Sequence, residues 1–443
     1  MTKFIKENYH YLLLFIFIFL TYTLFLFQHN YGDPISNYGF SYAIVKGLIP
    51  YKDFNIITTP LYAYIMSIGL FFWNNYTMFL LEQSLIVTIM FYLLNKIYGK
   101  KTYILLFVIA CFSFLGINAT YNFFTFFMMI ILLFLENKYK DKDYLIGIVL
   151  GLIILSKHTV GIFFIIPSII YYFKRKDKLL KRFTTTSIVI IIFTIYLILS
   201  NSLKQFIDLC LLGLIDFSSN NIHVYNKFFY TTIILFIISL IITIKRKDIT
   251  DYYLLFSIAF VIPLFDICHF SIYVLCITLQ ILPYIKKYEK YIGIVAFTIS
   301  ILIAINNYYS MLKFSPVLNK DIKHFNYLYN TKYYYKALNK YFSTFDQYEN
   351  AIILSYTKMQ YDISRDNKID YFDVPLYGNY GYNGSKKIIK EIDKKHDIYI
   401  IIDKKDYNNN KKDCQFNKNI AKYIIKHYKK HYEDSHVLIY YKK

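Results

Sequence analysis

The sequence predicts a polytopic α-helical membrane protein with about 11 transmembrane helices and a small C-terminal α/β domain outside the membrane. Three observations lead to this fold class. Hydrophobic residues make up 56% of the 443 residues and charged residues only 18%, below the ~25% of a typical soluble domain. Several apolar runs approach the ~20 residues that cross a bilayer. After residue 306 the apolar runs shorten to strand length and alternate with charged residues.

We expect eleven spans within a transmembrane domain at 1–305, with soft boundaries because several runs are shorter than a full span. They cover roughly 10–28, 77–95, 102–119, 122–135, 144–157, 159–173, 184–200, 228–244, 252–267, 270–284 and 291–306. A twelfth apolar segment, 61–73, follows Pro60 and ends at Trp73, a residue type enriched at membrane interfaces. We expect this segment to form a helix at the membrane surface.

The lysine clusters set the orientation. With a cytoplasmic N-terminus, every cluster falls in a cytoplasmic loop, as the positive-inside rule expects. The clusters lie at 96–101, 136–143, 174–182, 245–248 and 286–290. Counting 61–73 as a span would place all of them outside. We therefore expect a multi-pass protein of the plasma (inner) membrane with an extracytoplasmic C-terminal domain. The same loops help explain the net charge of +21, so no nucleic-acid partner is expected.

Polar residues that interrupt the apolar sequence collect on the outer side of this topology. They include Asp33 and Asp53 in the first outer loop (29–76), and Asn122, Lys157, His158, His223, Asp266 and His269 in later turns. A charge inside the hydrocarbon costs about 2.5–3.5 kcal/mol on insertion scales, so these side chains belong at the membrane edge or in a water-filled cavity. The alternative explanation is that short loops between spans are polar whether or not they form a site. Lys157 and Asp266 break apolar runs, which favours a cavity for a polar, anionic group. Glu82, inside the second span, would pair with a neighbouring helix or reach that cavity.

The segment at 32–60 reads GDPISNYGFSYAIVKGLIPYKDFNIITTP. An Asp after the first span, a short amphipathic helix, the pattern G-x-x-P-Y-x-D and a Pro before an interfacial helix resemble the GT-C glycosyltransferases. This superfamily includes the protein O-mannosyltransferases and the bacterial aminoarabinose transferases. SKHTVG at 156–161 and the D-x-x-H pattern of Asp266 and His269 extend the resemblance, which covers the hydropathy plan of 1–305.

The resemblance implies an inverting enzyme that moves a sugar from a polyprenyl-phosphate donor to a cell-envelope lipid, polysaccharide or protein at the outer membrane face. It implies that Asp33 is the catalytic base or lies beside the acceptor, and that Asp53 is a second acidic position. A carboxylate activates a sugar hydroxyl, which is a poor nucleophile. Asp33 would otherwise serve as a helix N-cap.

The leaving lipid phosphate needs positive or hydrogen-bonding partners. We expect Lys157, His158 and His269 to bind the donor phosphate, and Asn122, Asp266 and His223 to contact substrate. Some GT-C enzymes bind a divalent metal. Because Asp33 is followed by Pro34 rather than a D-x-D pattern, a metal is left open, and no other cofactor is expected.

The C-terminal stretch, 306–443, predicts a small α/β domain because strand-like and helix-like segments alternate. Strands are expected at 351–355, 369–372, 398–403 and 436–441, and helices at 320–344, 385–395 and 416–431. The glycine-rich stretch 372–387 is expected to be a structural turn or a loop over the membrane cavity.

Other functions fit parts of the same pattern. A transporter or flippase of lipid-linked saccharides would favour internal repeats and sites at the membrane midplane, whereas the ionisable residues here gather at one face. A polysaccharide polymerase usually has a large Arg-rich outer loop, and the longest later outer loop, 201–227, contains no arginine. A non-catalytic membrane assembly protein descended from the transferases is the remaining alternative.

Overall fold

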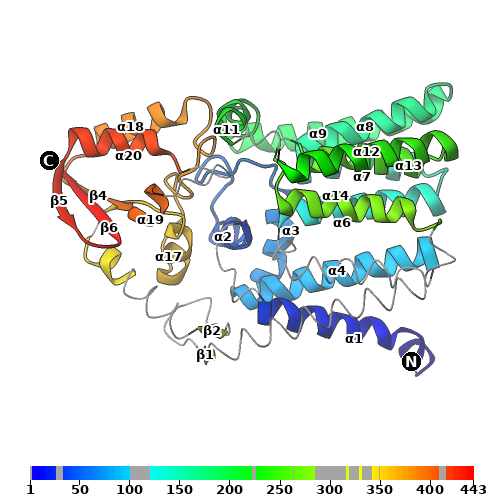
Figure 1. The fold of residues 1–443 in the computed structure, drawn as a ribbon, viewed down its shortest axis with the longest axis horizontal. Coiled ribbons are helices and arrows are strands. Elements are labelled where there is room, and N and C mark those ends of the chain that lie inside the picture. Colours follow the sequence, from blue (N-terminus) through cyan, green and yellow to red (C-terminus); the bar gives the residue numbers. More distant parts are fainter. Residues whose placement is uncertain are drawn as a thin grey trace.

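The computed structural model describes residues 2–25, 33–99, 120–221, 226–262, 264–284, 316–318, 329–331, 342–348, 350–408 and 416–443. A bundle of roughly parallel and antiparallel helices forms one end of the molecule, and a small sheet with its helices forms the other (Figure 1). The N-terminus lies at the far end of the bundle and the C-terminus lies in the sheet (Figure 1).

The bundle and its connections contain most of the helices. In chain order they are α1 (Thr2–Phe25), α2 (Asp33–Val45), α3 (Leu61–Leu70), α4 (Tyr76–Tyr98), α6 (Tyr121–Lys138), α7 (Asp143–Ser156), α8 (His158–Tyr172), α9 (Lys176–Leu199), α10 (Leu203–Phe206), the π-helix η2 (Ile207–Leu212), α11 (Gly213–Asn221), α12 (Lys227–Arg246), α13 (Ile249–Phe256), the 3-10 helix η3 (Ser257–Phe260) and α14 (Ile267–Ile281).

Four helices among the described residues are long and apolar enough to cross a membrane: α4, α6, α9 and α12. They correspond to four of the eleven expected spans. Five further expected spans contain shorter apolar helices, within α1, α7, α8, α13–η3 and α14. The expected spans 102–119 and 291–306 lie outside the described residues. The expected span 252–267 is shorter than predicted, because helical structure ends at Phe260, three residues before Pro263, and proline disfavours helix in the residue before it.

Polar residues at the turns start the long helices. The side chain of Asn75 accepts a hydrogen bond from the backbone N–H of Thr77 at the start of α4. Thr120 caps α6 and Asn226 caps α12 in the same way, each accepting from the N–H three residues further on. Each cap satisfies a backbone donor that the helix itself leaves unpaired.

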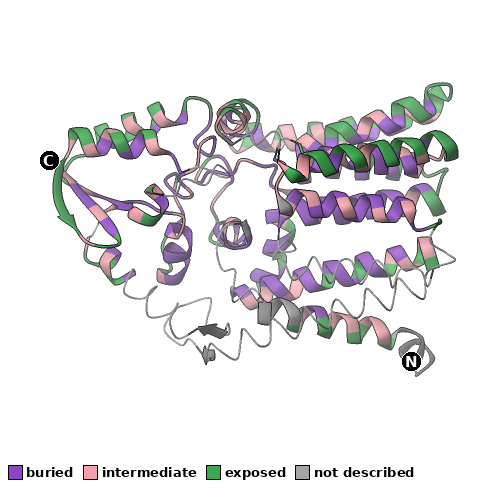
Figure 2. Ribbon diagram, viewed as in Figure 1, coloured by how far each residue is buried: buried purple, intermediate pink, exposed green. Residues whose placement is uncertain are grey.

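Exposure separates central from peripheral helices. In α6, 67% of the most apolar 18-residue window is buried, whereas in α9 and α12 only 17% is buried. Figure 2 shows the same contrast, with α6 mostly purple and α12 mostly green. A helix with an exposed apolar surface of this kind suits contact with lipid. We therefore place α6 at the centre of the bundle and α9 and α12 at its edge.

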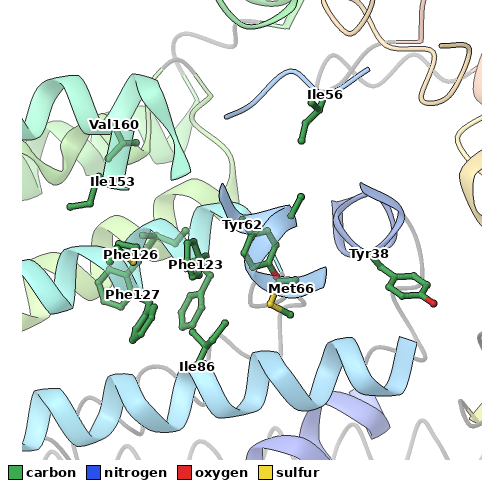
Figure 3. Packing of buried hydrophobic residues seen from close by; sticks show 14 of the residues in the cluster. Tyr38, Ile56, Tyr62, Met66, Ile86, Phe123, Phe126, Phe127, Ile153 and Val160 are labelled. Atoms are coloured by element: carbon green, nitrogen blue, oxygen red, sulfur yellow. The ribbon is translucent and has the colours of Figure 1, made fainter. Parts of the chain in front are cut away.

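The short helix α3 runs across the ends of the bundle helices (Figure 1). Tyr62 and Met66 of α3 pack with Phe123 of α6 and Ile86 of α4 (Figure 3). The residues that follow α3, including Trp73, are exposed. The prediction of a helix over 61–73 is therefore confirmed for Leu61–Leu70, while its position at a membrane surface remains a prediction.

The C-terminal unit, by which we mean the described residues from 342 to 443, contains a four-stranded sheet in the order β3-β4-β6-β5. Its elements are β3 (Ile352–Leu354), α17 (Lys358–Arg365), α18 (Gly384–Lys394), β4 (Ile398–Asp403), α19 (Lys404–Tyr407), α20 (Lys418–His427), β5 (Lys429–Glu433) and β6 (Val437–Lys442). Strands β3 and β4 are parallel, and the other pairs are antiparallel. Two three-residue strands, β1 (Pro316–Leu318) and β2 (Tyr329–Thr331), pair with each other before this unit.

Alternate strand residues face opposite sides of the sheet. Ile352, Ile400 and Ile402 pack with α18 and α20. Ile353 and Ile401 belong instead to the core that continues into the helical bundle. Both faces of these strands are therefore covered, which agrees with their continuous apolar sequence. The boundary of a separate domain at residue 306 remains a prediction.

One expected C-terminal strand is wrong, and one expected helix, present as α20, is shorter than predicted. Residues 369–372 form no strand, because Asp370 and Asp373 turn towards the ammonium of Lys358, each at 3.2 Å. The expected helix 416–431 ends at His427, and Lys429–Glu433 pair with β6 as an edge strand. The expected strands at 351–355, 398–403 and 436–441 and the expected helix at 385–395 are confirmed as β3, β4, β6 and α18. Most of the expected helix 320–344 lies outside the described residues.

A buried charged cluster joins α6 to α9 near the end of α6 opposite to its start at Tyr121. Arg182 of α9 donates hydrogen bonds to Glu136 of α6 at 2.5 and 3.2 Å and to Asp143 of α7 at 2.7 Å. Tyr253 of α13 donates to the same glutamate at 3.1 Å. Arg182 and Glu136 have no exposed surface. Because each charge has partners, removing any one of them would leave an uncompensated buried charge and weaken the contact between these helices.

Candidate active site

Polar residues at the starts of α6, α8 and α14 meet in one cluster. The Nζ of Lys157 donates a hydrogen bond to Oδ1 of Asn122 at 2.7 Å. The Nδ2 of the same amide lies 3.4 Å from Nε2 of His269. The Nδ1 of His269 lies 2.9 Å from both carboxylate oxygens of Asp266. The structure therefore brings together four of the residues that the sequence analysis selected, and three of them are almost fully buried.

The hydrogen bonds in this cluster have one consistent direction. A lysine ammonium can only donate, so Asn122 presents its oxygen to Lys157 and its NH2 group to His269. Nε2 of His269 then accepts, and Nδ1 carries the proton that it donates to Asp266. His269 is neutral in this arrangement. Among these four residues, Lys157 carries the positive charge that an anionic group would meet.

Asp266 positions both the start of α14 and the ring of His269. Its Oδ1 accepts a hydrogen bond from the backbone N–H of His269 at 2.9 Å, as an N-cap does. The ring and the backbone N–H of His269 both hydrogen-bond the carboxylate of Asp266, which favours its charged form. The charged carboxylate therefore fixes both the orientation and the tautomer of the imidazole.

Helix α2 reaches this cluster through Asn37. The Oδ1 of Asn37 accepts a hydrogen bond from the backbone N–H of Tyr121 at 3.3 Å, and the ammonium of Lys157 lies 5.8 Å from the centre of the Tyr121 ring. Asp33 is the first residue of α2, and its side chain is outside the described part of the structure. Positions four apart share one helix face, so position 33 lies on the face of α2 that carries Asn37.

His158 follows Lys157 but lies outside this hydrogen-bonded chain. Its side chain is buried, and neither ring nitrogen meets a partner with hydrogen-bond geometry. Burial, followed by the charge of Lys157, lowers the pKa of His158 to about 4, although the nearby backbone of Cys210 acts in the opposite direction. The imidazole is therefore neutral at pH 7, and it can exchange hydrogen bonds with a ligand but supplies no positive charge.

Asp53 stabilises its own turn. Its Oδ2 accepts a hydrogen bond from the backbone N–H of Ile49 at 2.7 Å, within a turn in which Tyr51 has a positive φ of 68°. The hydroxyl of Tyr51 donates to the carbonyl of Thr58 at 2.6 Å and anchors the rest of the loop. The structure does not join Asp53 to the Asn122 cluster. The sequence pattern predicted Asp53 as a site residue but could not show that its carboxylate forms a hydrogen bond within its own turn.

The structure describes only one of the two remaining residues selected in the sequence, Glu82 and His223. His223 lies outside the described residues. Glu82 of α4 accepts a hydrogen bond from the backbone N–H of Gly69 in α3 at 2.6 Å. Of the two roles expected for Glu82, pairing with a neighbouring helix is the one observed.

The glycine-rich stretch 372–387 packs against η2 and α11. The backbone N–H of Tyr382 donates to Oδ1 of Asp208 at 3.3 Å, and the ammonium of Lys387 pairs with the same carboxylate. Gly378 has a φ of 86°, and a Cβ there would lie 2.5 Å from the side chain of Phe217. Glycine is therefore required both for the backbone conformation and for the close approach. The stretch acts as a structural turn against the bundle end.

The described residues contain no group of three or more His, Cys, Asp or Glu side chains placed to hold a metal ion. Asp53, one of the two acidic positions considered for a metal, is engaged by Ile49. The metal question therefore stays open, and no step below depends on a metal.

One contribution to the cluster was missed in the sequence. Asn37 was passed over within the first outer segment, although it lies one helical turn after Asp33. Tyr121, from the same outer turn as Asn122, has its ring beside Lys157.

No protein-family model matches the sequence, and no curated protein matches it. Among solved structures, the chain is similar to the crystal structure of the Archaeoglobus fulgidus oligosaccharyltransferase in complex with zinc and sulfate, with a TM-score of 0.41 and 12% sequence identity. The alignment covers 85% of this chain and 64% of the archaeal chain, so this chain spans less than two thirds of that protein's length. At this TM-score the similarity identifies neither the family nor the activity of the chain.

Proposed function

We propose that this chain is a membrane glycosyltransferase of the GT-C kind. It transfers a sugar, with inversion, from a polyprenyl-phosphate donor to a lipid, polysaccharide or protein of the cell envelope. The observation that supports this proposal is the buried Lys157–Asn122–His269–Asp266 cluster, which is linked through Asn37 to the helix that begins at Asp33. The reaction would take place at the extracytoplasmic face of the plasma membrane.

Lys157 supplies the charge that the leaving phosphate needs. As the bond between the anomeric carbon and the phosphate oxygen breaks, negative charge develops on that oxygen. A buried ammonium stabilises this charge more strongly than it would in water. Asn122 holds the ammonium in place, and the neutral His158 can donate a hydrogen bond without adding charge.

Asp33 serves as the base. Its carboxylate takes the proton of the acceptor hydroxyl as that oxygen attacks the anomeric carbon from the face opposite to the phosphate. The new glycosidic bond forms as the bond between the anomeric carbon and the phosphate oxygen breaks, so the configuration at that carbon inverts. The proton ends on Asp33, and polyprenyl phosphate leaves with the electron pair.

The first test measures sugar transfer by the purified protein in lipid nanodiscs, with a panel of polyprenyl-phosphate sugars and cell-envelope acceptors. Asp33→Asn should reduce transfer by at least ~100-fold, in line with the 10²–10⁴-fold contribution of a general base, while binding of polyprenyl phosphate is retained. Activity of this variant at the wild-type level would exclude Asp33 as the base.

A parallel assay in proteoliposomes distinguishes a transferase from a flippase. A transferase consumes the lipid-linked sugar without moving the intact donor across the bilayer. Translocation of intact donor without transfer would instead identify a transporter.

A further inference from the structure

We propose that Tyr42 and Asp366 are positioning residues, through which the C-terminal unit holds α2 against the active-site cluster. This inference rests on the proposed function, because the first residue of α2 is the proposed base, Asp33. The C-terminal unit would then be part of the catalytic assembly rather than an accessory domain.

A direct contact joins α2 to the end of α17. The hydroxyl of Tyr42 donates a hydrogen bond to Oδ1 of Asp366 at 2.7 Å, and the ammonium of Lys46 lies 2.6 Å from the same oxygen. Asp366 adopts a left-handed conformation, with a φ of 63°, and its N–H donates to the last carbonyls of α17. The carboxylate is therefore presented by a fixed helix end.

The backbones of the two helices also approach closely. A Cβ at Gly39 of α2 would lie 2.1 Å from Sδ of Met359 in α17, so only glycine admits the methionine in its present position. Met359 and Tyr42 are fully or almost fully buried and belong to one apolar core. The Lys46–Asp366 pair is partly exposed and adds little on its own. The hydrogen bond between Tyr42 and Asp366 and the buried packing around Gly39 therefore act together to hold α2 in place.

The two contacts of α2 lie on opposite faces. At ~100° per residue, Gly39 and Tyr42 project about 160° and 140° away from Asn37. Asn37 meets the start of α6, whereas Gly39 and Tyr42 meet α17. Helix α2 is thus held between the bundle and the C-terminal unit. Position 33 shares the face of α2 that carries Asn37. Contact with α17 on the other side of α2 therefore keeps that face next to the Asn122 cluster.

The first experiment compares Asp366→Ala with the wild-type full-length protein in nanodiscs. We expect kcat for sugar transfer to fall at least ~10-fold while KM for the polyprenyl-phosphate donor stays within about twofold, because the Lys157 cluster is untouched. Amide hydrogen exchange over residues 34–45 should become at least ~10-fold faster, because α2 has lost a support.

Asp346→Ala is the matched control. Asp346 pairs with Arg365 of the same helix α17 at 2.7 Å but is not joined to α2 by these contacts, so both readouts should match the wild type. Unchanged exchange over 34–45 in Asp366→Ala would overturn the positioning role, whether or not sugar transfer is detected. Faster exchange in a protein that transfers no sugar would leave the contact valid and refute the proposed function instead.

A rescue experiment tests the packing itself. Gly39→Ala improves the intrinsic helix propensity of α2 but places a Cβ where Met359 now lies. We expect kcat to fall at least ~10-fold, and the added substitution Met359→Ala to restore it to within about threefold of the wild type. Failure of the second substitution to restore activity would show that α2 does not depend on this contact.

Discussion

The side chain of Asn122 is the junction of the candidate site. Its oxygen orients Lys157, and its NH2 group sets the tautomer of His269. An amide serves an acceptor and a donor at once, whereas a carboxylate has no N–H to give and an aliphatic residue has neither group. Asn122 therefore orients the ammonium of Lys157 and the ring of His269 together.

Replacing Lys157 should weaken binding of the lipid phosphate. A hydrogen bond to a charged group contributes about 1.5–3 kcal/mol, so Lys157→Met is expected to raise the Kd for polyprenyl phosphate by roughly 10- to 100-fold. The measurement is binding of radiolabelled polyprenyl phosphate to the protein in nanodiscs.

Lys178→Met is the control for this substitution. Lys178 forms its ion pair with Asp141 near the opposite end of the bundle, so its removal should leave binding unchanged. Equal losses in both variants would mean that net charge, rather than the site, attracts the lipid.

Sequence patterns identified the residues of the cluster better than their contacts. Lys157 and Asp266 interrupt apolar runs, and a polar residue in such a run needs a reason to be there. The pairing of Asn122 with His269 joins positions 147 residues apart, and no local pattern records that. For Asp53 the sequence pattern suggested a site residue, but in the structure its carboxylate accepts a hydrogen bond from Ile49 within its own turn.

At the level of elements, short apolar runs predicted β4 and β6 closely and missed β5. All five residues of β5, Lys429–Glu433, are exposed, so an edge strand of this kind has no apolar alternation to detect and depends on its hydrogen bonds to β6. A pair of carboxylates at the end of β4 could not be predicted from the strand pattern either. Asp403 and Asp406 lie side by side there and share the hydroxyl of Ser355, at 3.2 and 3.1 Å.

This carboxylate pair should make the C-terminal unit less stable as pH rises. Burial, together with the charge of Asp403, raises the pKa of Asp406 to about 7. Between pH 4 and 7 the unfolded chain has lost this proton while the folded chain keeps it. The free energy of unfolding therefore falls by up to about 1.4 kcal/mol per pH unit in this window and levels off above it. Asp406→Asn should flatten the slope.

The measurement is thermal unfolding of the full-length protein, followed in detergent from pH 4 to 8. Glu391→Gln serves as the control, because Glu391 is exposed and pairs only with a lysine one turn away, so the wild-type slope should persist. If Asp406→Asn retained that slope as well, another group would be responsible for the pH dependence.

At the scale of the whole molecule, different parts of the chain gather at the two ends of the helical bundle. The C-terminal unit lies at one end of the bundle, and the N-terminus lies at the other (Figure 1). The start of α6 is joined to α2, which also contacts the C-terminal unit. Which of the two ends faces the cytoplasm remains the prediction made from the lysine clusters.

Cysteine labelling tests the sidedness directly. In a chain whose five cysteines are replaced by serine, Lys386→Cys in α18 should react with a membrane-impermeant maleimide added outside intact cells. Lys140→Cys, in the loop between α6 and α7, should react only after the membrane is opened. Both positions are exposed, so a reversed pattern would invert the topology and place the proposed reaction in the cytosol.

The buried Arg182–Glu136 pair bears on how the chain is made. In the expected topology both residues lie at the cytoplasmic ends of their helices, so neither charge has to enter the hydrocarbon during insertion. Glu136 precedes Arg182 by 46 residues, so its carboxylate would stay in cytoplasmic water until α9 has been made. The pair would then close the cytoplasmic ends of α6, α7 and α9 together in a late step of assembly.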